Sequence, residues 1–232
     1  MNKPMVRSYI AIGDSLSEGL GDDGFETERI HRGWTDRLAH LLSVEAQLAG
    51  SDFHFGNLAL RGSKTRSIMT SQLEAALRQK PDLVTVMTGS NDIFANPQEL
   101  LEVERLLRHG LTRLTNAGIR VLVVNTADPQ HLRLTKNLRP KSKRMTQLIN
   151  RVCAELSLPV VDIHNVVELA DIRYWCSDMA HFSRHGHKLI ANLAAEQLKL
   201  THRHVQTPQQ LMEFPDRGLK ANLVWAKRDV IP

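Results

Sequence analysis

The sequence predicts a three-layer α/β/α fold built on a doubly wound sheet of about five parallel strands. Short, apolar, β-branched segments recur along the chain, longer amphipathic segments separate them, and this alternation repeats about five times. The 232 residues suffice for one domain with a sizeable core. We therefore expect folding without a disulfide or a structural metal.

The predicted strands are nearly continuous apolar runs, which is typical of parallel strands that helices cover on both faces. They span residues 8–12, 54–60, 83–88, 120–125 and 159–163. Helical periodicity fills the intervals, with apolar residues from 34 to 42, 68 to 77, 100 to 114, 145 to 156 and 189 to 198. Pro81 and Gly118 are expected to end the second and third helices, and Ser183 to cap the last.

The composition argues against several classes of protein. The net charge is only +5, acids and bases are interspersed, and aromatic residues make up 5%, so nothing favours nucleic-acid binding. No apolar run reaches the ~20 residues of a membrane span, and the N-terminus lacks the pattern of a signal peptide, so we expect a cytoplasmic protein. Cys153 and Cys176 form no C-x-x-C pair, which argues against a zinc or redox site.

The chain is predicted to divide into a catalytic domain, residues 1–200, and a C-terminal extension, residues 201–232. The extension has a mixed pattern that includes Pro208 and Pro215. Trp225 is the side chain expected to dock it. The oligomeric state stays open.

Residues able to do chemistry follow the predicted strands, where ligands bind in this fold class. The blocks are Gly13-Asp14-Ser15-Leu16 with Gly19, Arg61-Gly62-Ser63, Gly89-Ser90-Asn91-Asp92 and Asp178-Met179-Ala180-His181. Together they supply a nucleophile, oxyanion donors and an oriented base. Asp14 and Asp92 are expected to bind loop amides, and His185 and His187 to be helix residues.

These four blocks, in this order, resemble the SGNH/GDSL hydrolases, serine esterases and lipases with a flavodoxin-like fold. The resemblance covers roughly residues 6–200. The last block departs from the family's usual D-G-x-H-P, because Met179 and Phe182 replace the glycine and the proline. This departure affects the expected shape of the loop more than the D-x-x-H spacing.

The resemblance implies a role for each matched residue. Ser15 would be the nucleophile, His181 the general base and Asp178 the acid that orients the imidazole. The N–H groups of Ser15 and Gly62 and the side-chain amide of Asn91 would form the oxyanion hole. It thus implies a small-molecule ester substrate, cleaved through an acyl-enzyme without cofactor or metal. Compact polar loops favour short acyl chains.

Several alternatives remain open at this stage. A second D-x-x-H, Asp128 to His131, precedes a basic segment, residues 131–144, which is either a solvated loop and helix start or a lid for anionic substrates. We expect the pair Asp178 and His181 to hold the base. The same residues would also serve an acyltransferase or thioesterase, while a flavodoxin-like binding module would hold a flavin phosphate on its first loop. A pseudoenzyme would keep the fold as a ligand sensor.

Overall fold

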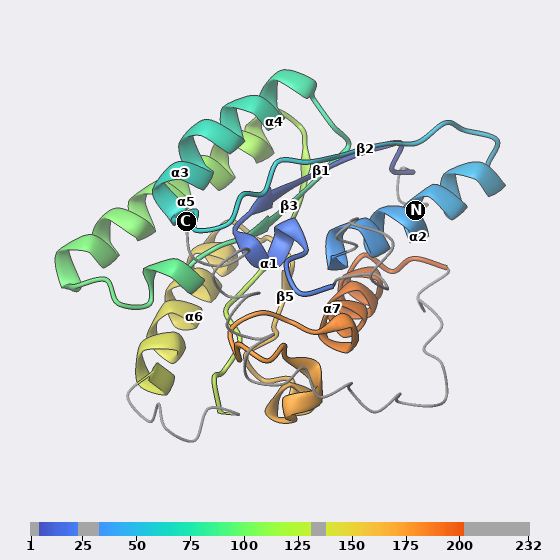
Figure 1. Ribbon diagram of the computed structural model, residues 1–232. Helices are drawn as coiled ribbons and strands as arrows, with labels where there is room; N and C mark the ends of the chain where they lie inside the picture. The colour runs from blue at the N-terminus through green and yellow to red at the C-terminus, as the bar shows by residue number, and fades with distance from the viewer. Residues whose placement is uncertain (1–4, 23–32, 131–137, 202–232) are drawn as a thin grey trace.

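The chain forms a five-stranded, all-parallel sheet in the computed structural model, which describes residues 5–22, 33–130 and 138–201 (Figure 1). The strand order is β2-β1-β3-β4-β5. The strands are β1 (Ser8–Gly13), β2 (His54–Asn57), β3 (Leu83–Met87), β4 (Arg120–Val124) and β5 (Val160–Val161). The direction of winding reverses between β1 and β3, so the carboxyl ends of these two strands flank the crevice in which this fold class binds ligands.

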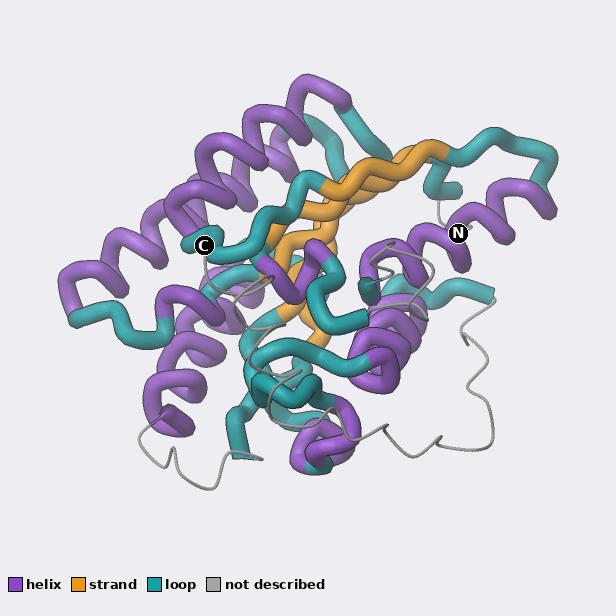
Figure 2. The backbone as a smooth tube through the Cα atoms, viewed as in Figure 1, coloured by secondary structure: helices purple, strands orange, loops and turns teal. Residues whose placement is uncertain are grey.

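Helices cover both faces of the sheet and make the three layers (Figure 2). One face packs on α2 (Trp34–Leu48) and α7 (Arg184–Gln197), and the other on α4 (Leu73–Gln79), α5 (Pro97–Asn116) and α6 (Leu138–Glu155). Successive strand residues point to opposite faces, so β1 sends Tyr9 into the first layer and Ile10 into the second. The predicted fold class is confirmed.

Two strands end earlier than their apolar patterns predict. The segment 54–60 pairs with β1 only as far as Asn57, whose side chain then accepts the N–H of Ala59 at 3.0 Å. The segment 159–163 pairs with β4 only at Val160 and Val161. Beyond them, the N–H of Ile163 donates to the side chain of Asn125 at 2.9 Å instead of a ladder carbonyl. After β5 a polar side chain thus replaces the next rung of the sheet, whereas after β2 the N–H of Leu60 still donates to the carbonyl of Gly13 at 3.2 Å.

The helices begin and end at residues with identifiable reasons. Ser183 precedes α7 and accepts the N–H of Gly186, as predicted. Asn96 and Glu99 form a capping box that starts α5. The predicted helix over 68–77 is instead three joined pieces: α3 (Thr65–Ser67), a π-helical segment (Ile68–Gln72) and α4. That helix also continues to Gln79 before Pro81.

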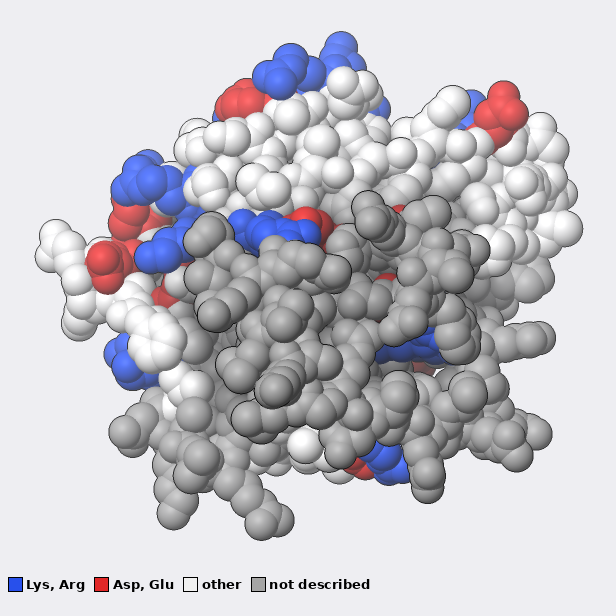
Figure 3. Space-filling model, in the orientation of Figure 1, with Lys and Arg blue, Asp and Glu red and all other residues white. Residues whose placement is uncertain are grey.

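Several predictions fall outside the described residues: the role of His131, most of a lid over residues 131–144, and the extension beyond Thr201 with Trp225. No helix in the described ranges combines the length and apolar character needed to cross a membrane. On the face drawn in Figure 3, basic and acidic side chains lie close together. Ion pairs such as Arg61 with Glu18 account for this mixing of charge.

Candidate active site

Ser15 lies at the carboxyl end of β1, as the first residue of the short helix α1 (Ser15–Glu18) (Figure 1). Asp14 caps this helix by accepting the N–H of Leu16 at 3.0 Å. The turn from strand to helix is tight at Gly13, where a Cβ atom would lie 2.6 Å from Oγ of Ser17 and 2.8 Å from the carbonyl oxygen of Met87. Glycine is therefore required just before the Asp14–Ser15 turn.

Three of the predicted site residues lie in hydrogen-bond contact. Nε2 of His181 is 2.9 Å from Oγ of Ser15, and Nδ1 is 2.5 Å from Oδ2 of Asp178. Because a carboxylate only accepts hydrogen bonds, the imidazole proton belongs on Nδ1, which leaves Nε2 as an acceptor for the serine hydroxyl. The side chains of His181 and Ser15 are nearly enclosed, each residue being 8% exposed.

The carboxylate of Asp178 is fixed by its own loop. Oδ1 accepts the backbone N–H groups of Ala180 at 3.0 Å and of His181 at 3.1 Å. Burial opposes ionisation here, but the hydrogen bonds and the attraction of His181 hold the pKa of Asp178 below its ordinary value. The acid therefore stays charged and keeps the imidazole oriented at neutral pH.

The loop that carries His181 folds without the glycine and proline usual in the family. Met179 adopts the left-handed conformation, φ 59°, at the position where the glycine usually stands. The N–H of Cys176 donates to the carbonyl of His181 at 2.8 Å, which closes the loop. Phe182 is fully buried and packs on Trp175 with ring centroids 4.9 Å apart. The departures in sequence therefore leave the pairing of aspartate and histidine intact.

The predicted oxyanion donors lie on the loops after β2 and β3. Gly62 has φ 74°, a conformation that favours glycine, and its neighbour Arg61 is held by Glu18 of α1. Asn91 follows β3 in a 3-10 turn (Ser90–Asp92), and its Nδ2 donates to the carbonyl of Ser63 at 3.0 Å. One amide hydrogen of Asn91 is therefore used to bind the loop that carries Gly62.

Asp14 and Asp92 bind loop amides, as expected. Oδ2 of Asp92 accepts both the N–H and the hydroxyl of Thr65 at 2.8 Å, which holds the start of α3 against the loop after β3. Asp14 is fully buried, and burial raises its pKa to about 6, against the opposing effects of the Leu16 N–H and of His181. Oδ2 of Asp14 has no hydrogen-bond partner among the described residues. The ionised carboxylate of Asp14, next to Ser15 in sequence, therefore lowers the free energy of unfolding.

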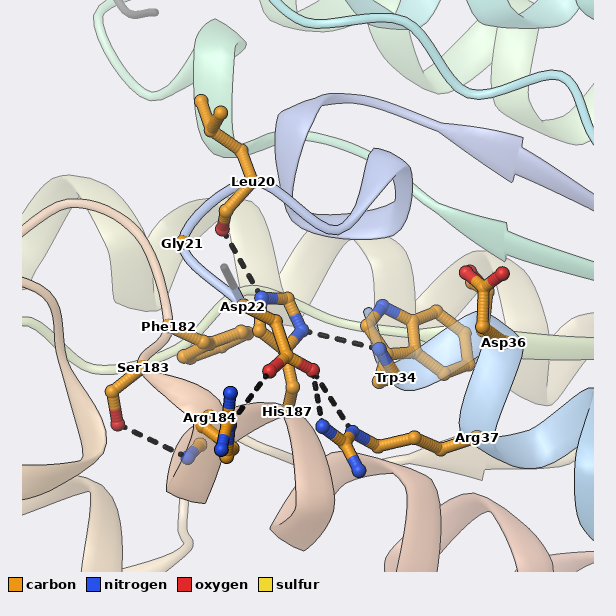
Figure 4. Close-up of polar contacts among 12 residues, drawn as sticks. Leu20, Gly21, Asp22, Trp34, Asp36, Arg37, Phe182, Ser183, Arg184 and His187 are labelled. Carbon is orange, nitrogen blue, oxygen red and sulfur yellow. Dashed lines mark hydrogen bonds and ion pairs between the residues drawn. The ribbon is translucent and has the colours of Figure 1, made fainter. Parts of the chain in front are cut away.

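A second buried histidine, His187, connects segments beside the site (Figure 4). His187 lies in α7, as expected, and its Nδ1 accepts the N–H of Trp34 at 3.2 Å. The contact from Nε2 to the carbonyl of Leu20 is 3.1 Å. Beside it, Asp22 accepts from Arg37 at 2.5 Å and lies 3.5 Å from Arg184. These contacts join the segment after α1 to the start of α2 and to α7.

The second D-x-x-H is arranged differently. Asp128 pairs with the guanidinium of Arg139 at 2.8 Å, and His131 lies outside the described residues. A cavity of about 480 Å³ adjoins this pair and is also lined by Pro140, Lys143 and His164. Among residues 5–22, 33–130 and 138–201, no three His, Cys, Asp or Glu side chains gather closely enough to hold a metal ion.

Residues that support the site were not anticipated from the sequence. Glu18 holds Arg61, His187 joins two segments, and Gln72 bonds the backbone beside Ser15. One signal was available for Gln72: it is a polar residue four positions after Ile68 and next to Leu73, on the apolar side of a helix. A polar residue that interrupts an apolar helix face suggests a buried hydrogen-bonding role.

Comparison with solved structures finds the same fold in several hydrolases. An Axe2 variant, an acetylxylan esterase from Geobacillus stearothermophilus, superposes with a TM-score of 0.70 at 16% identity, over 89% of this chain and 100% of that one. LAE5, an alpha/beta hydrolase enzyme from the metagenome of Lake Arreo, Spain, gives 0.67 at 19%, over 84% and 96%. The psychrotrophic esterase EstA from Pseudoalteromonas sp. gives 0.64 at 17%, over 83% and 97%.

Sequence comparison identifies the family. No curated protein matches the chain in sequence at a significant level. The model of the GDSL-like lipase/acylhydrolase family, in contrast, matches residues 11–189, which span all four blocks and the five strands except the first residues of β1. The chain therefore belongs to the GDSL-like lipase/acylhydrolase family, a family of ester-hydrolysing enzymes.

Proposed function

We propose that the chain is a serine esterase that acts through an acyl-enzyme on Ser15. The observation that carries the proposal is the contact chain from Oγ of Ser15 to His181 and on to Asp178, at 2.9 Å and 2.5 Å. A hydroxyl is a poor nucleophile until a base removes its proton, and here an oriented, nearly enclosed imidazole lies within reach.

The reaction follows from this arrangement. Nε2 of His181 takes the hydroxyl proton as Oγ of Ser15 bonds to the ester carbonyl carbon. When the C–O bond to the alcohol breaks, the imidazolium returns that proton to the leaving oxygen. A water then attacks the acyl-enzyme by the same proton transfer, and the acid is released. Asp178 stays ionised throughout and stabilises the imidazolium.

Three donors are proposed to stabilise the oxyanion. The N–H of Ser15 has no partner within α1, because the first residue of a helix has none. The N–H of Gly62 is on a loop that Glu18 anchors, and no hydrogen bond from it occurs among the described residues. Asn91 uses one amide hydrogen on Ser63 and keeps the second for the substrate.

The structural neighbours support the same roles. Axe2 variants that replace a serine, an aspartate or a histidine by alanine are described as catalytic mutants, and that aspartate and histidine are three positions apart, as Asp178 and His181 are here. Axe2 is an acetylxylan esterase. We therefore propose that short acyl chains are preferred, in line with the compact polar loops around Ser15.

The proposal is tested with wild type and Ser15→Ala on a panel of chromogenic esters from acetyl to long-chain, together with a fluorophosphonate probe. We expect hydrolysis to be fastest for acetyl or butyryl esters, and hydrolysis and labelling to be lost in Ser15→Ala with the circular dichroism spectrum unchanged. Full labelling of Ser15→Ala would reject the nucleophile, and faster turnover of long-chain esters would reject the chain-length preference.

A further inference from the structure

Gln72 is a buried polar residue, 8% exposed, at the end of the π-helical segment Ile68–Gln72. Burying an amide without hydrogen bonds costs free energy, so the buried side chain of Gln72 needs partners. Both ends of the amide are engaged: Oε1 accepts one hydrogen bond, and Nε2 donates two. π-Helical turns inside helices occur frequently at functional sites.

Two of these hydrogen bonds go to Gly13, two residues before Ser15. The N–H of Gly13 donates to Oε1 at 2.7 Å, and Nε2 donates back to the carbonyl of Gly13 at 2.9 Å. β2 pairs with β1 only as far as Asn57, which lies opposite Ala11. The N–H of Leu60 also donates to the carbonyl of Gly13, at 3.2 Å, so beyond the last paired residue of β2 Gln72 supplies the acceptor for the Gly13 N–H and a second donor to its carbonyl.

The third hydrogen bond links Gln72 to the opposite side of the site. Nε2 donates to Oγ of Ser63 at 3.2 Å, and Ser63 directly follows Gly62. The carbonyl of the same Ser63 accepts Nδ2 of Asn91 at 3.0 Å. One side chain thus joins the end of β1, the loop after β2 and, through Ser63, the loop after β3.

We infer that Gln72 is a positioning residue that fixes the nucleophile relative to the two oxyanion donors, Gly62 and Asn91. The inference rests on the proposed function for its catalytic consequence. Gln72 does not touch the reacting atoms; it acts through Gly13 and Ser63. Displacement of oriented groups by about 1 Å can cost ~100-fold in rate. The three hydrogen bonds of Gln72 to Gly13 and Ser63, called the Gln72 bracket below, are therefore expected to affect the rate.

The test compares Gln72→Met, which keeps the size but loses all three hydrogen bonds, with Leu73→Ala. Leu73 is the fully buried neighbour in the core behind the sheet, so its substitution lowers stability without removing any of these bonds. At a temperature where both variants are folded, we expect Gln72→Met to lower kcat about 10- to 100-fold with KM within about twofold. Leu73→Ala should keep the wild-type kcat. A wild-type kcat in Gln72→Met would overturn the inference.

Coupling to the oxyanion donors gives a second measurement. If Gln72 acts by placing Asn91, the double variant Gln72→Met with Asn91→Ala should be scarcely slower than Asn91→Ala alone, because residues that act as one unit are not additive. Effects on kcat that multiply in full would show that Gln72 does not act through that donor, and would overturn the inference.

Amide hydrogen exchange separates this inference from the proposed function, because it needs no turnover. Gln72→Met should speed exchange in peptides covering 13–18 and 58–64, while Leu73→Ala should leave both peptides protected. Unchanged exchange in Gln72→Met would overturn the Gln72 bracket whatever the activity. Hydrolysis that survives in Ser15→Ala would instead reject the proposed function, and accelerated exchange would still support the Gln72 bracket.

Discussion

His181 and His187 lie six residues apart, on either side of the start of α7, and differ in their partners. His181 is 8% exposed and lies between a carboxylate and a hydroxyl. His187 is fully buried, and its two ring nitrogens hydrogen-bond backbone groups, the N–H of Trp34 and the carbonyl of Leu20 (Figure 4). The first arrangement suits proton transfer, and the second suits a fixed neutral ring.

The comparison shows that partners, more than burial, decide what a histidine does. Burial lowers the pKa of His187 to about 4, so the ring is neutral at physiological pH and accepts the Trp34 N–H. A protonated ring would place a second N–H against that donor. Leu20 is five residues after Ser15, so this contact fixes the segment that follows the nucleophile. Both histidines therefore serve one site in different ways.

The largest expected effect separates the two histidines. His181→Ala should lower kcat about 10⁴-fold or more, because the serine loses its base. His187→Gln, which retains an acceptor and a donor, should keep kcat within about tenfold but lower the free energy of unfolding by about 1–3 kcal/mol. The measurements are kcat on an acetyl ester and urea unfolding. An inactive but fully stable His187→Gln would contradict this division of roles.

The two aspartates of the D-x-x-H sequences sharpen the comparison. Asp178→Asn should lower kcat about 10⁴-fold, because the amide no longer holds the tautomer in which Nε2 of His181 accepts. Asp128→Asn should leave kcat within about tenfold. Asp128 is only 9% exposed, but its partner Arg139 has a side chain that is 56% exposed, so solvent screens the pair and stability should change little. The check is kcat for both variants beside wild type; the reverse order of losses would assign the base to the loop after β4.

The titrations of Asp14 and His187 change the free energy of unfolding with pH in opposite directions, and this effect is intermediate in size. The folded pKa of Asp14 is raised from 3.8 to about 6, so its contribution to stability is lost as pH rises through this range. The pKa of His187 is lowered from 6.5 to about 4, so its contribution is lost as pH falls through that range. Each amounts to on the order of 3 kcal/mol, and the two largely cancel between pH 4 and 6.

Single variants should expose each titration. Asp14→Asn should be stabilised at neutral pH and should lose stability more steeply than wild type as pH falls from 6.5 to 4. His187→Gln should do the opposite and become less stable as pH rises from 4 to 6. Free energies of urea unfolding at pH 4, 5, 6 and 7 provide the measurement. Parallel pH curves for the three proteins would show that neither group titrates as described.

The smallest expected effect concerns the left-handed Met179 beside His181. Met179→Gly should raise the free energy of unfolding by up to about 1 kcal/mol, because glycine adopts this conformation without strain. Ser157→Gly is the matched control, since Ser157 has φ 53° at the end of α6. Both should be stabilised in thermal unfolding, and both should keep the wild-type kcat. A slower Met179→Gly would show that the methionine stiffens the loop for catalysis.

The sequence by itself determined the fold class, the approximate place of every strand and the residue types at the site. Apolar runs, helical periodicity and cap residues such as Ser183 are local patterns. Such patterns predict structure from the sequence alone. The four blocks identified Ser15, Asp178 and His181 because their spacing resembles the family's, and the structure places these three in contact.

Only the tertiary structure decided which distant groups meet. His181 and Ser15 are 166 residues apart, His187 and Trp34 are 153, and Gln72 and Gly13 are 59. The early end of β5 also depends on the side chain of Asn125, which replaces a ladder partner of Ile163. Such contacts arise from how helices pack on the sheet, and a buried polar side chain takes whichever donor or acceptor that packing brings within reach.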